Sequence, residues 1–210
     1  MDKKILFVDV DNTFVNFNTT FKFINLITKK NKLKKIIYNL SNSFFFKVLY
    51  KIKLYDSVYL AYKLLKNISK NNLEIEAKNF VDHHIDEKSI NSKCLNIINE
   101  KKRDGFEIIL LSNSLDLIVK NIMIKYKFHK YYSNNLLFKN EKCSGMLSFY
   151  LRKSDIVKKY FKITNDIYII TDNIEDIDCT NYSKKSYIVI NNKNKKFWHK
   201  NKKNNYEFIY

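Results

Sequence analysis

Two aspartates near the N-terminus are spaced so that they could share a cation. Asp9 and Asp11 lie in DVDNT (9–13), at the end of the apolar run ILFVD. In an extended strand end, side chains two residues apart project the same way, so the two carboxylates repel each other unless a cation offsets their charge. Mg²⁺ suits this role because it takes oxygen ligands from one or two carboxylates, water and phosphate. On its own, however, the pattern is equally typical of a turn that caps a helix.

Further polar groups follow in an order that makes the pattern more specific. Ser112, at the end of EIILLS, could donate its hydroxyl to a phosphate oxygen, and Lys153, in LRKSDIVKKYF, could supply a fixed positive charge. Asp172 and Asp176, in TDNIED, could complete a cation site. Singly, these residues have simpler explanations, as a capping serine, one lysine among many and two solvent-facing acids. Together they predict a site for a phosphate ester and a divalent ion.

These residues must be positioned by a sheet. The runs 5–9, 107–112 and 167–172 are apolar and each ends in a polar residue, and 187–190 is a fourth candidate strand. Short apolar runs of this kind predict parallel strands buried on both faces, with ligands gathering at their carboxyl ends. Helices are expected at the ranges 93–102, 115–127 and 153–161, with Asp104-Gly105 turning the chain into the second strand. The fold class is therefore α/β, a Rossmann-like doubly wound parallel sheet.

The segment between the first two strands has a different pattern. Its apolar residues recur at helical spacing, which predicts helices at 21–28, 33–40, 44–66 and 73–81. The aromatic run at 41–65 is typical of a small helical bundle that buries its rings, and the alternative is a pocket for a lipid. The segment is therefore interpreted as an all-helical insertion.

Composition leaves two classes of partner open. The 39 Lys and Arg residues exceed the 21 Asp and Glu residues, for a net charge of +18, which raises the question of nucleic acid or an anionic membrane. Because Lys, Asn and Ile are abundant throughout, Pro is absent and Gly occurs twice, a solvated basic surface is favoured. The basic, aromatic tail at 191–210 could stack on bases or lie on a membrane, but such tails more often pack their rings on the body.

The three cysteines are widely spaced and follow no metal-binding pattern, which predicts reduced thiols in a cytoplasmic protein. No stretch reaches the length of a transmembrane span. We therefore expect a small phosphorylated substrate and no obligatory nucleic acid, with peripheral membrane contact left open. The sequence leaves the oligomeric state undetermined.

The four motifs, in this order and strand context, resemble the haloacid dehalogenase superfamily, and most closely its phosphoserine-phosphatase-like enzymes. The resemblance extends over roughly residues 4–190, and the helical insertion stands where that family carries its cap domain. LLKNISKNNLEIEAKNFV (64–81) also looks like the family's cap, less specifically. The resemblance implies an α/β core of residues 1–15 and 90–210 with a helical cap of residues 16–89.

The resemblance also implies catalytic roles. Asp9 would be the nucleophile that forms an aspartyl-phosphate, and Asp11 would protonate the leaving oxygen and then activate water. Ser112 and Lys153 would hold the phosphoryl group. An acid at position 11 favours a phosphatase or phosphotransferase, because dehalogenase-like members lack an acid there.

The same resemblance implies a metal site and substrate contacts. Asp9, the backbone carbonyl of Asp11, and Asp172 would bind Mg²⁺, with Asp176 beside the ion. Thr13 would orient the first motif next to the substrate.

Departures from the family fall on residues that would contact the substrate. Phosphoserine phosphatases carry a glutamate where this chain has Asn18, and paired glycines where it has Asn113 and Ser114. A neutral Asn18 fits a substrate without a free amine better than phosphoserine itself. The function predicted is Mg²⁺-dependent hydrolysis of a small phosphomonoester, such as a phosphoserine-like, polyol or surface-polysaccharide precursor phosphate. The alternatives are a lipid-phosphate phosphatase, a phosphotransferase, or a non-catalytic basic module that binds nucleic acid or membrane.

Overall fold

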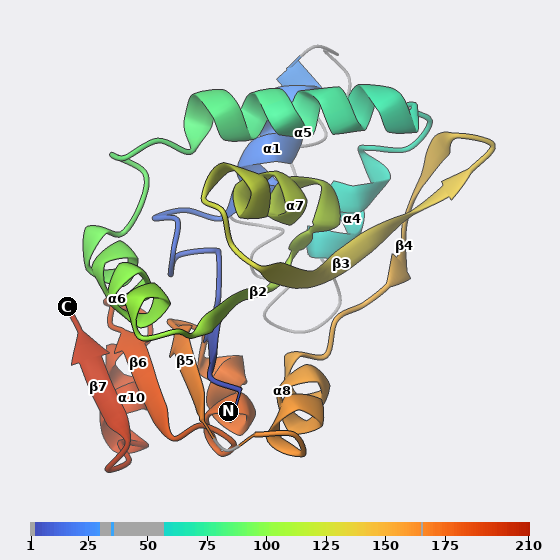
Figure 1. The fold of residues 1–210 in the computed structure, drawn as a ribbon. Helices are drawn as coiled ribbons and strands as arrows, with labels where there is room; N and C mark the ends of the chain where they lie inside the picture. The colour runs from blue at the N-terminus through green and yellow to red at the C-terminus, as the bar shows by residue number, and fades with distance from the viewer. Residues whose placement is uncertain (1–2, 30–34, 36–56, 165) are drawn as a thin grey trace.

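A single mostly parallel sheet organises the protein. The structure, a computed structural model, describes residues 3–29, 35, 57–164 and 166–210. Within these residues seven strands lie in the spatial order β4-β3-β2-β1-β5-β6-β7 (Figure 1). They are β1 (Ile5–Val8), β2 (Glu107–Leu115), β3 (Lys130–Lys139), β4 (Lys142–Phe149), β5 (Ile167–Thr171), β6 (Lys185–Val189) and β7 (Tyr206–Ile209). Every neighbouring pair is parallel except β3 and β4, so the predicted α/β class is confirmed.

The central strands are buried on both faces. On β1, Leu6 and Val8 enter one hydrophobic cluster, whereas Ile5 and Phe7 enter another. Successive side chains of a strand point to opposite faces, so helices must cover both sides of the sheet. The first cluster includes residues of α1 (Thr19–Lys29), α5 (Lys70–His84), α6 (Ser92–Arg103) and α7 (Asp116–Lys125). The second includes residues of α8 (Lys153–Phe161) and α9 (Ile177–Thr180).

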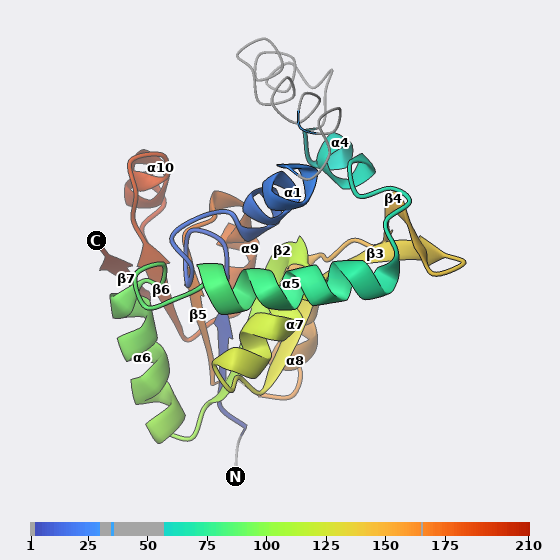
Figure 2. The same ribbon diagram turned by 90° about the horizontal axis from the view of Figure 1, so that it is seen from above.

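Three described helices lie in the segment of residues 16–89 that follows β1. They are α1, α4 (Ser57–Lys63) and α5, and Figure 2 shows α5 lying alongside α7. The predicted helices 21–28 and 73–81 fall within α1 and α5. Apart from residue 35, the predicted helix 33–40 and the first part of the predicted helix 44–66 lie outside the described residues.

The two ends of this segment meet. Val15 forms an isolated β-bridge with Ile90, and the Asn16 N–H donates to the Ser89 carbonyl at 2.8 Å. The chain thus leaves the sheet and returns to it at one place, and α6 then leads into β2. Gly105, with φ of +81°, makes the turn between them in a left-handed conformation that glycine adopts without strain.

Three strands, β3, β4 and β7, were not predicted. The turn between β3 and β4 contains Asn140 and Glu141, both with positive φ (48° and 59°). A two-residue hairpin turn is usually recognised in a sequence by Asn-Gly or Asp-Gly. This turn contains no glycine, so the sequence does not indicate it. In addition, β2 continues through Leu115, past the predicted end at Ser112, so Asn113 and Ser114 lie in the strand rather than in a turn.

The C-terminal segment is part of the body. It forms α10 (Lys195–Lys200) and β7, which pairs with β6, and the chain ends at this edge of the sheet (Figure 1). Trp198 is fully buried and Tyr206 is 7% exposed, whereas Tyr210 is 65% exposed. The prediction that the tail packs rings on the body is therefore confirmed for Trp198 and Tyr206.

The cysteines Cys94, Cys143 and Cys179 are buried, and none of these three forms a disulfide. Among the helices that the structure describes, none combines the length and apolar character that crossing a membrane requires.

Candidate active site

The sheet brings the acidic motifs to one edge. Val8, the last residue of β1, lies in register with Leu110 of β2 and Ile170 of β5. Asp9 and Asp172 therefore follow neighbouring parallel strands and emerge at the same carboxyl edge. There the described residues line a cleft of about 470 Å³. Its lining comprises Asp9, Asp11, Asn12, Asn18, Thr20, Phe21, Tyr62, Ser112, Asn113, Ser114, Asn134, Tyr150, Lys153, Asp172, Asn173 and Glu175.

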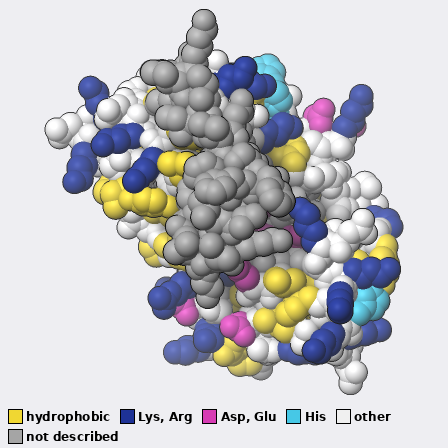
Figure 3. Space-filling model, turned by 180° about the vertical axis from the view of Figure 1, so that it is seen from behind, with side chains coloured by type: hydrophobic (Ala, Val, Ile, Leu, Met, Phe, Trp, Pro, Cys, Tyr) yellow, Lys and Arg dark blue, Asp and Glu magenta, His cyan; other side chains and the backbone are white. Residues whose placement is uncertain are grey.

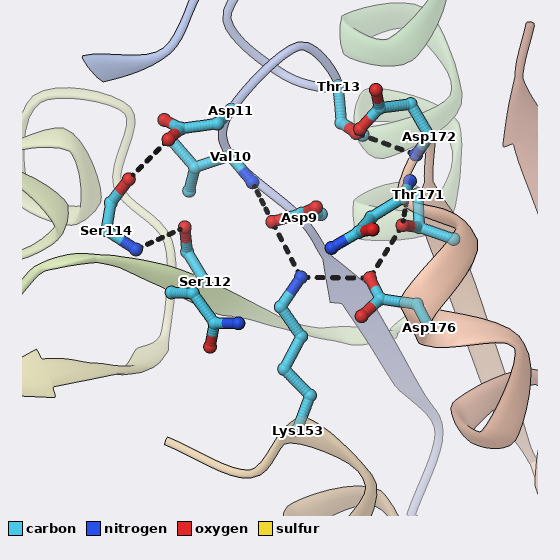
Figure 4. Close-up of polar contacts among 12 residues, drawn as sticks. Asp9, Val10, Asp11, Thr13, Ser112, Ser114, Lys153, Thr171, Asp172 and Asp176 are labelled. Atoms are coloured by element: carbon cyan, nitrogen blue, oxygen red, sulfur yellow. Dashed lines mark hydrogen bonds and ion pairs between the residues drawn. The ribbon is translucent and has the colours of Figure 1, made fainter. Parts of the chain in front are cut away.

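Lys153 joins two of the aspartates at the floor of this cleft (Figure 4). Its Nζ lies 3.0 Å from Asp9 Oδ1 and 2.9 Å from Asp176 Oδ2, and all three side chains are less than a tenth exposed. The same Asp9 oxygen accepts the Val10 N–H at 2.8 Å, and Thr171 donates its hydroxyl to Asp176 Oδ2 at 2.7 Å. Burial lowers the pKa of Lys153, but the two carboxylates more than reverse this and raise it above its ordinary value. The lysine is therefore a fixed positive charge beside Asp9.

One lysine does not neutralise the acids around it. Burial raises the pKa of Asp9 to about 8; Lys153 opposes this shift, and the charges of Asp176 and Asp172 add to it. Burial also raises the pKa of Asp172, which Thr13 and Lys153 counteract in part. Two carboxylates thus share one cationic side chain, with the carboxylate of Asp172 nearby, and a divalent ion would supply the missing positive charge.

The carboxylate oxygens of the cleft are the type of ligand that Mg²⁺ takes. Within the part of the chain that the structure describes, no three or more His, Cys, Asp or Glu side chains are arranged as a complete metal-binding group. Mg²⁺ does not require such a group, because it keeps several waters and binds through one or two carboxylates plus substrate phosphate. Asp9 and Asp172 line the cleft and could serve it. Asp176 is engaged with Lys153 and Thr171 and is not part of the cleft lining described above.

Asp11 points away from Asp9, contrary to the expectation that both carboxylates project the same way. Its Oδ1 accepts the backbone N–H of Thr19 at 2.9 Å and the Thr19 hydroxyl at 2.7 Å. Its Oδ2 accepts the Ser114 hydroxyl at 2.7 Å (Figure 4). The expectation was wrong because β1 ends at Val8, so the regular alternation of a strand does not reach Asp11. Burial raises the pKa of Asp11, and its three hydrogen bonds counteract that shift in part.

Thr13 contacts Asp172 and does not line the cleft. It is fully buried, donates its hydroxyl to Asp172 Oδ1 at 2.9 Å and accepts the Asp172 backbone N–H at 2.9 Å. It thereby links the loop after β1 to the loop after β5. This geometry fits a residue that orients the two motifs better than one that touches substrate.

The remaining predicted residues lie on the cleft wall. Ser112 Oγ accepts the Ser114 N–H at 3.2 Å, and Asn113 accepts at its carbonyl a 2.6 Å hydrogen bond from Asn134 Nδ2. Asn18 accepts the Phe21 N–H with its side-chain oxygen at 2.9 Å, as a residue that caps helix α1 does. The structure therefore brings every predicted residue except Thr13 and Asp176 to the surface of the cleft.

Several residues that contact the acidic motifs were missed by sequence reasoning. Asn191 Nδ2 donates to Asp172 Oδ2, and Asn194 Nδ2 and Trp198 Nε1 donate to the Asp172 carbonyl oxygen. Asn134, in the unpredicted strand β3, accepts the Leu151 N–H just before Lys153. The polar residues that follow the candidate strand at 187–190 were the available signal, because they leave the same sheet edge as the other motifs.

Comparison with known proteins shows which solved structures share this fold. No family model matches the chain, and no curated protein matches it. A protein of unknown function from Bordetella pertussis Tohama I superposes with a TM-score of 0.82 at 9% identity, covering 100% of this chain and 99% of that one. A phosphoserine phosphatase, solved as a phospho-aspartyl intermediate analogue, gives a TM-score of 0.61 at 20% identity over 90% of this chain and 87% of that one.

A HAD family hydrolase from Salmonella enterica serovar Typhi gives a TM-score of 0.65 at 15% identity, covering 90% of this chain and 62% of that one. The identities are low and the covered shares are high, so the likeness is one of fold. The chain therefore shares the fold of this phosphoserine phosphatase and this HAD family hydrolase.

Proposed function

We propose that the protein is a Mg²⁺-dependent phosphomonoester hydrolase that uses Asp9 as its nucleophile. The observation that carries the proposal is the pairing at the cleft floor: the Asp9 carboxylate contacts Lys153 at 3.0 Å, while Asp11 is held on the opposite side by Thr19 and Ser114. This arrangement separates a carboxylate that can attack from a carboxyl group that can transfer a proton.

In the first half of the reaction an Asp9 oxygen attacks phosphorus, and the bond from phosphorus to the leaving oxygen breaks. Asp11 gives its proton to that oxygen, so the alcohol leaves neutral. Lys153 and the Ser112 hydroxyl hold the phosphoryl oxygens, and the fixed charge of the lysine offsets the negative charge that develops on them. Mg²⁺, held by Asp9 and Asp172, supplies further positive charge when it is bound.

In the second half Asp11 acts as a base. It takes a proton from water, whose oxygen attacks the phosphorus of the aspartyl-phosphate. The bond between phosphorus and Asp9 breaks, inorganic phosphate leaves, and both side chains return to their starting states. A single carboxyl group therefore acts as acid and then as base, which suits a group whose pKa burial raises.

The cleft favours a small, largely uncharged leaving group. Apart from the acids and Lys153, its described lining is formed mainly by amides and hydroxyls, including Asn18, Asn113 and Asn134. Amides and hydroxyls can donate to and accept from a polyhydroxy compound. We therefore infer a polyol, surface-polysaccharide precursor or phosphoserine-like monoester as the class of substrate.

The non-catalytic alternative finds less support. Lys and Arg side chains are distributed around the visible part of the face in Figure 3, among uncharged residues. Two of the tail rings offered for stacking on bases, those of Trp198 and Tyr206, are buried in the body.

The test is release of inorganic phosphate by the full chain with Mg²⁺, from p-nitrophenyl phosphate and from a panel of phosphorylated metabolites. Turnover is expected to fall to background in Asp9→Asn. Asp178→Asn, an exposed acid on α9, is the matched control and should retain turnover. Equal turnover by Asp9→Asn and the wild type would refute the assignment of the nucleophile. Loss of the phosphate ester without release of inorganic phosphate would indicate transfer to another acceptor.

A further inference from the structure

The segment after β6 folds over the loop that carries Asp172. Asn194 Nδ2 and Trp198 Nε1 donate to the Asp172 carbonyl oxygen at 2.8 Å and 3.1 Å, and Asn191 Nδ2 donates to the Asp172 Oδ2 at 3.2 Å. Asn194 and Trp198 are buried, at 4% and 0% exposed. The segment 191–198 thus makes hydrogen bonds to both the backbone and the side chain of Asp172.

The orientation of both amides is fixed by their other hydrogen bonds. Asn191 Oδ1 accepts the backbone N–H groups of Lys193 at 2.9 Å and Asn194 at 3.2 Å. Asn194 Oδ1 accepts the Asn191 N–H at 2.8 Å. An amide oxygen that accepts from backbone N–H groups leaves its amino group to donate elsewhere. The amino group of Asn191 donates to Asp172, and that of Asn194 donates to both Asp172 and the Val189 carbonyl.

The carboxylate of Asp172 is consequently held from two sides. Thr13 donates to Oδ1 from the loop after β1, and Asn191 donates to Oδ2 from the segment after β6. An ionised carboxylate offers about four acceptor positions, so two hydrogen bonds leave room for a cation. Groups that orient a metal ligand in this way govern the affinity of the site for its ion.

We propose that Asn191, Asn194 and Trp198 are positioning residues that hold Asp172 in place as a ligand of the divalent cation. The proposal rests on the proposed function, and it gives the C-terminal segment a role in the active site.

The experiment measures Mg²⁺ affinity directly. Trp198 is the single tryptophan of the chain and contacts the Asp172 carbonyl, so its fluorescence reports on this loop. Isothermal titration calorimetry gives an independent dissociation constant. The principal variant is Asn191→Ser, because a serine hydroxyl can still accept the backbone N–H groups but does not reach Asp172. The matched control is Asn192→Ser, at an exposed neighbouring position.

Asn191→Ser is expected to weaken Mg²⁺ binding by about tenfold or more, and Asn192→Ser to leave it unchanged. Turnover of Asn191→Ser should recover at high Mg²⁺ concentration, which a general loss of structure would not allow. Trp198→Phe, followed by calorimetry, removes the indole donor to the backbone and should weaken binding in the same direction.

Two results would overturn the proposal, and they are distinguishable. If the wild type binds Mg²⁺ and Asn191→Ser binds it equally well, the positioning role is wrong while the proposed function stands. If the wild type itself does not bind Mg²⁺, the metal-dependent function fails as well.

Discussion

Replacing Lys153 by methionine tests the electrostatics of the cleft floor. The lysine lies between Asp9 Oδ1 at 3.0 Å and Asp176 Oδ2 at 2.9 Å, and its side chain is 6% exposed. Methionine keeps an unbranched chain of similar length but no charge, so the Asp176 carboxylate, and at higher pH the Asp9 carboxylate as well, would lose its cationic partner. Removing one member of a buried ion pair typically costs about 3–5 kcal/mol, because the charge left behind stays desolvated. We expect Lys153→Met to lower the free energy of unfolding by about that amount.

The assay is urea unfolding in EDTA at neutral pH, followed by circular dichroism. The control is Lys159→Met, at an exposed position in the last turn of the same helix α8, where the loss should stay below about 1 kcal/mol. If Lys153→Met is as stable as the wild type, or if both variants lose the same amount, the lysine does not compensate buried charge and the reasoning is refuted.

Three further predictions concern the acid, the pH dependence and the core. Asp11→Asn should slow the first release of the alcohol from an alkyl phosphate by about 10²–10⁴-fold, and the first release of nitrophenolate from p-nitrophenyl phosphate much less, since nitrophenolate leaves without a proton; equal losses in single-turnover assays of leaving-group release would contradict a general acid. In EDTA the free energy of unfolding should fall as the pH rises from about 4 to about 8. The reason is that the pKa of Asp9 is about 8 in the native state against an ordinary value of 3.8, so in this range the native state holds a proton that the unfolded state has lost. Saturating Mg²⁺ should flatten that slope, and urea titrations across this range with and without the ion measure it. Phe7→Ala should cost about 3–5 kcal/mol in thermal or urea unfolding, because Phe7 is 1% exposed in the core, and Phe149→Ala, at a 50% exposed position, should cost less than about 1 kcal/mol; similar losses would show that the burial pattern is wrong.

Local pattern was sufficient for the central elements. The apolar runs that end in Asp9, Ser112 and Asp172 specify strands buried on both faces, and all three lie in the sheet as expected. The helices around 93–102 and 153–161 were predicted within one residue at each end, because their amphipathic spacing is continuous. In contrast, the β3–β4 hairpin has a mixed polar sequence and a turn without glycine, so nothing local marks it.

The sequence by itself determined which side chains are present and which strand ends deliver them, since the burial of the central strands follows from their local apolar pattern. Only the tertiary structure decided how those side chains are turned. Asp11 faces Thr19 and Ser114, whereas Asp9 faces Lys153, and Asp172 is held by residues 159 positions before it and 19 to 26 after it. Such contacts depend on where loops from different strands meet, and a hydrogen bond between distant residues leaves no periodic trace in the chain.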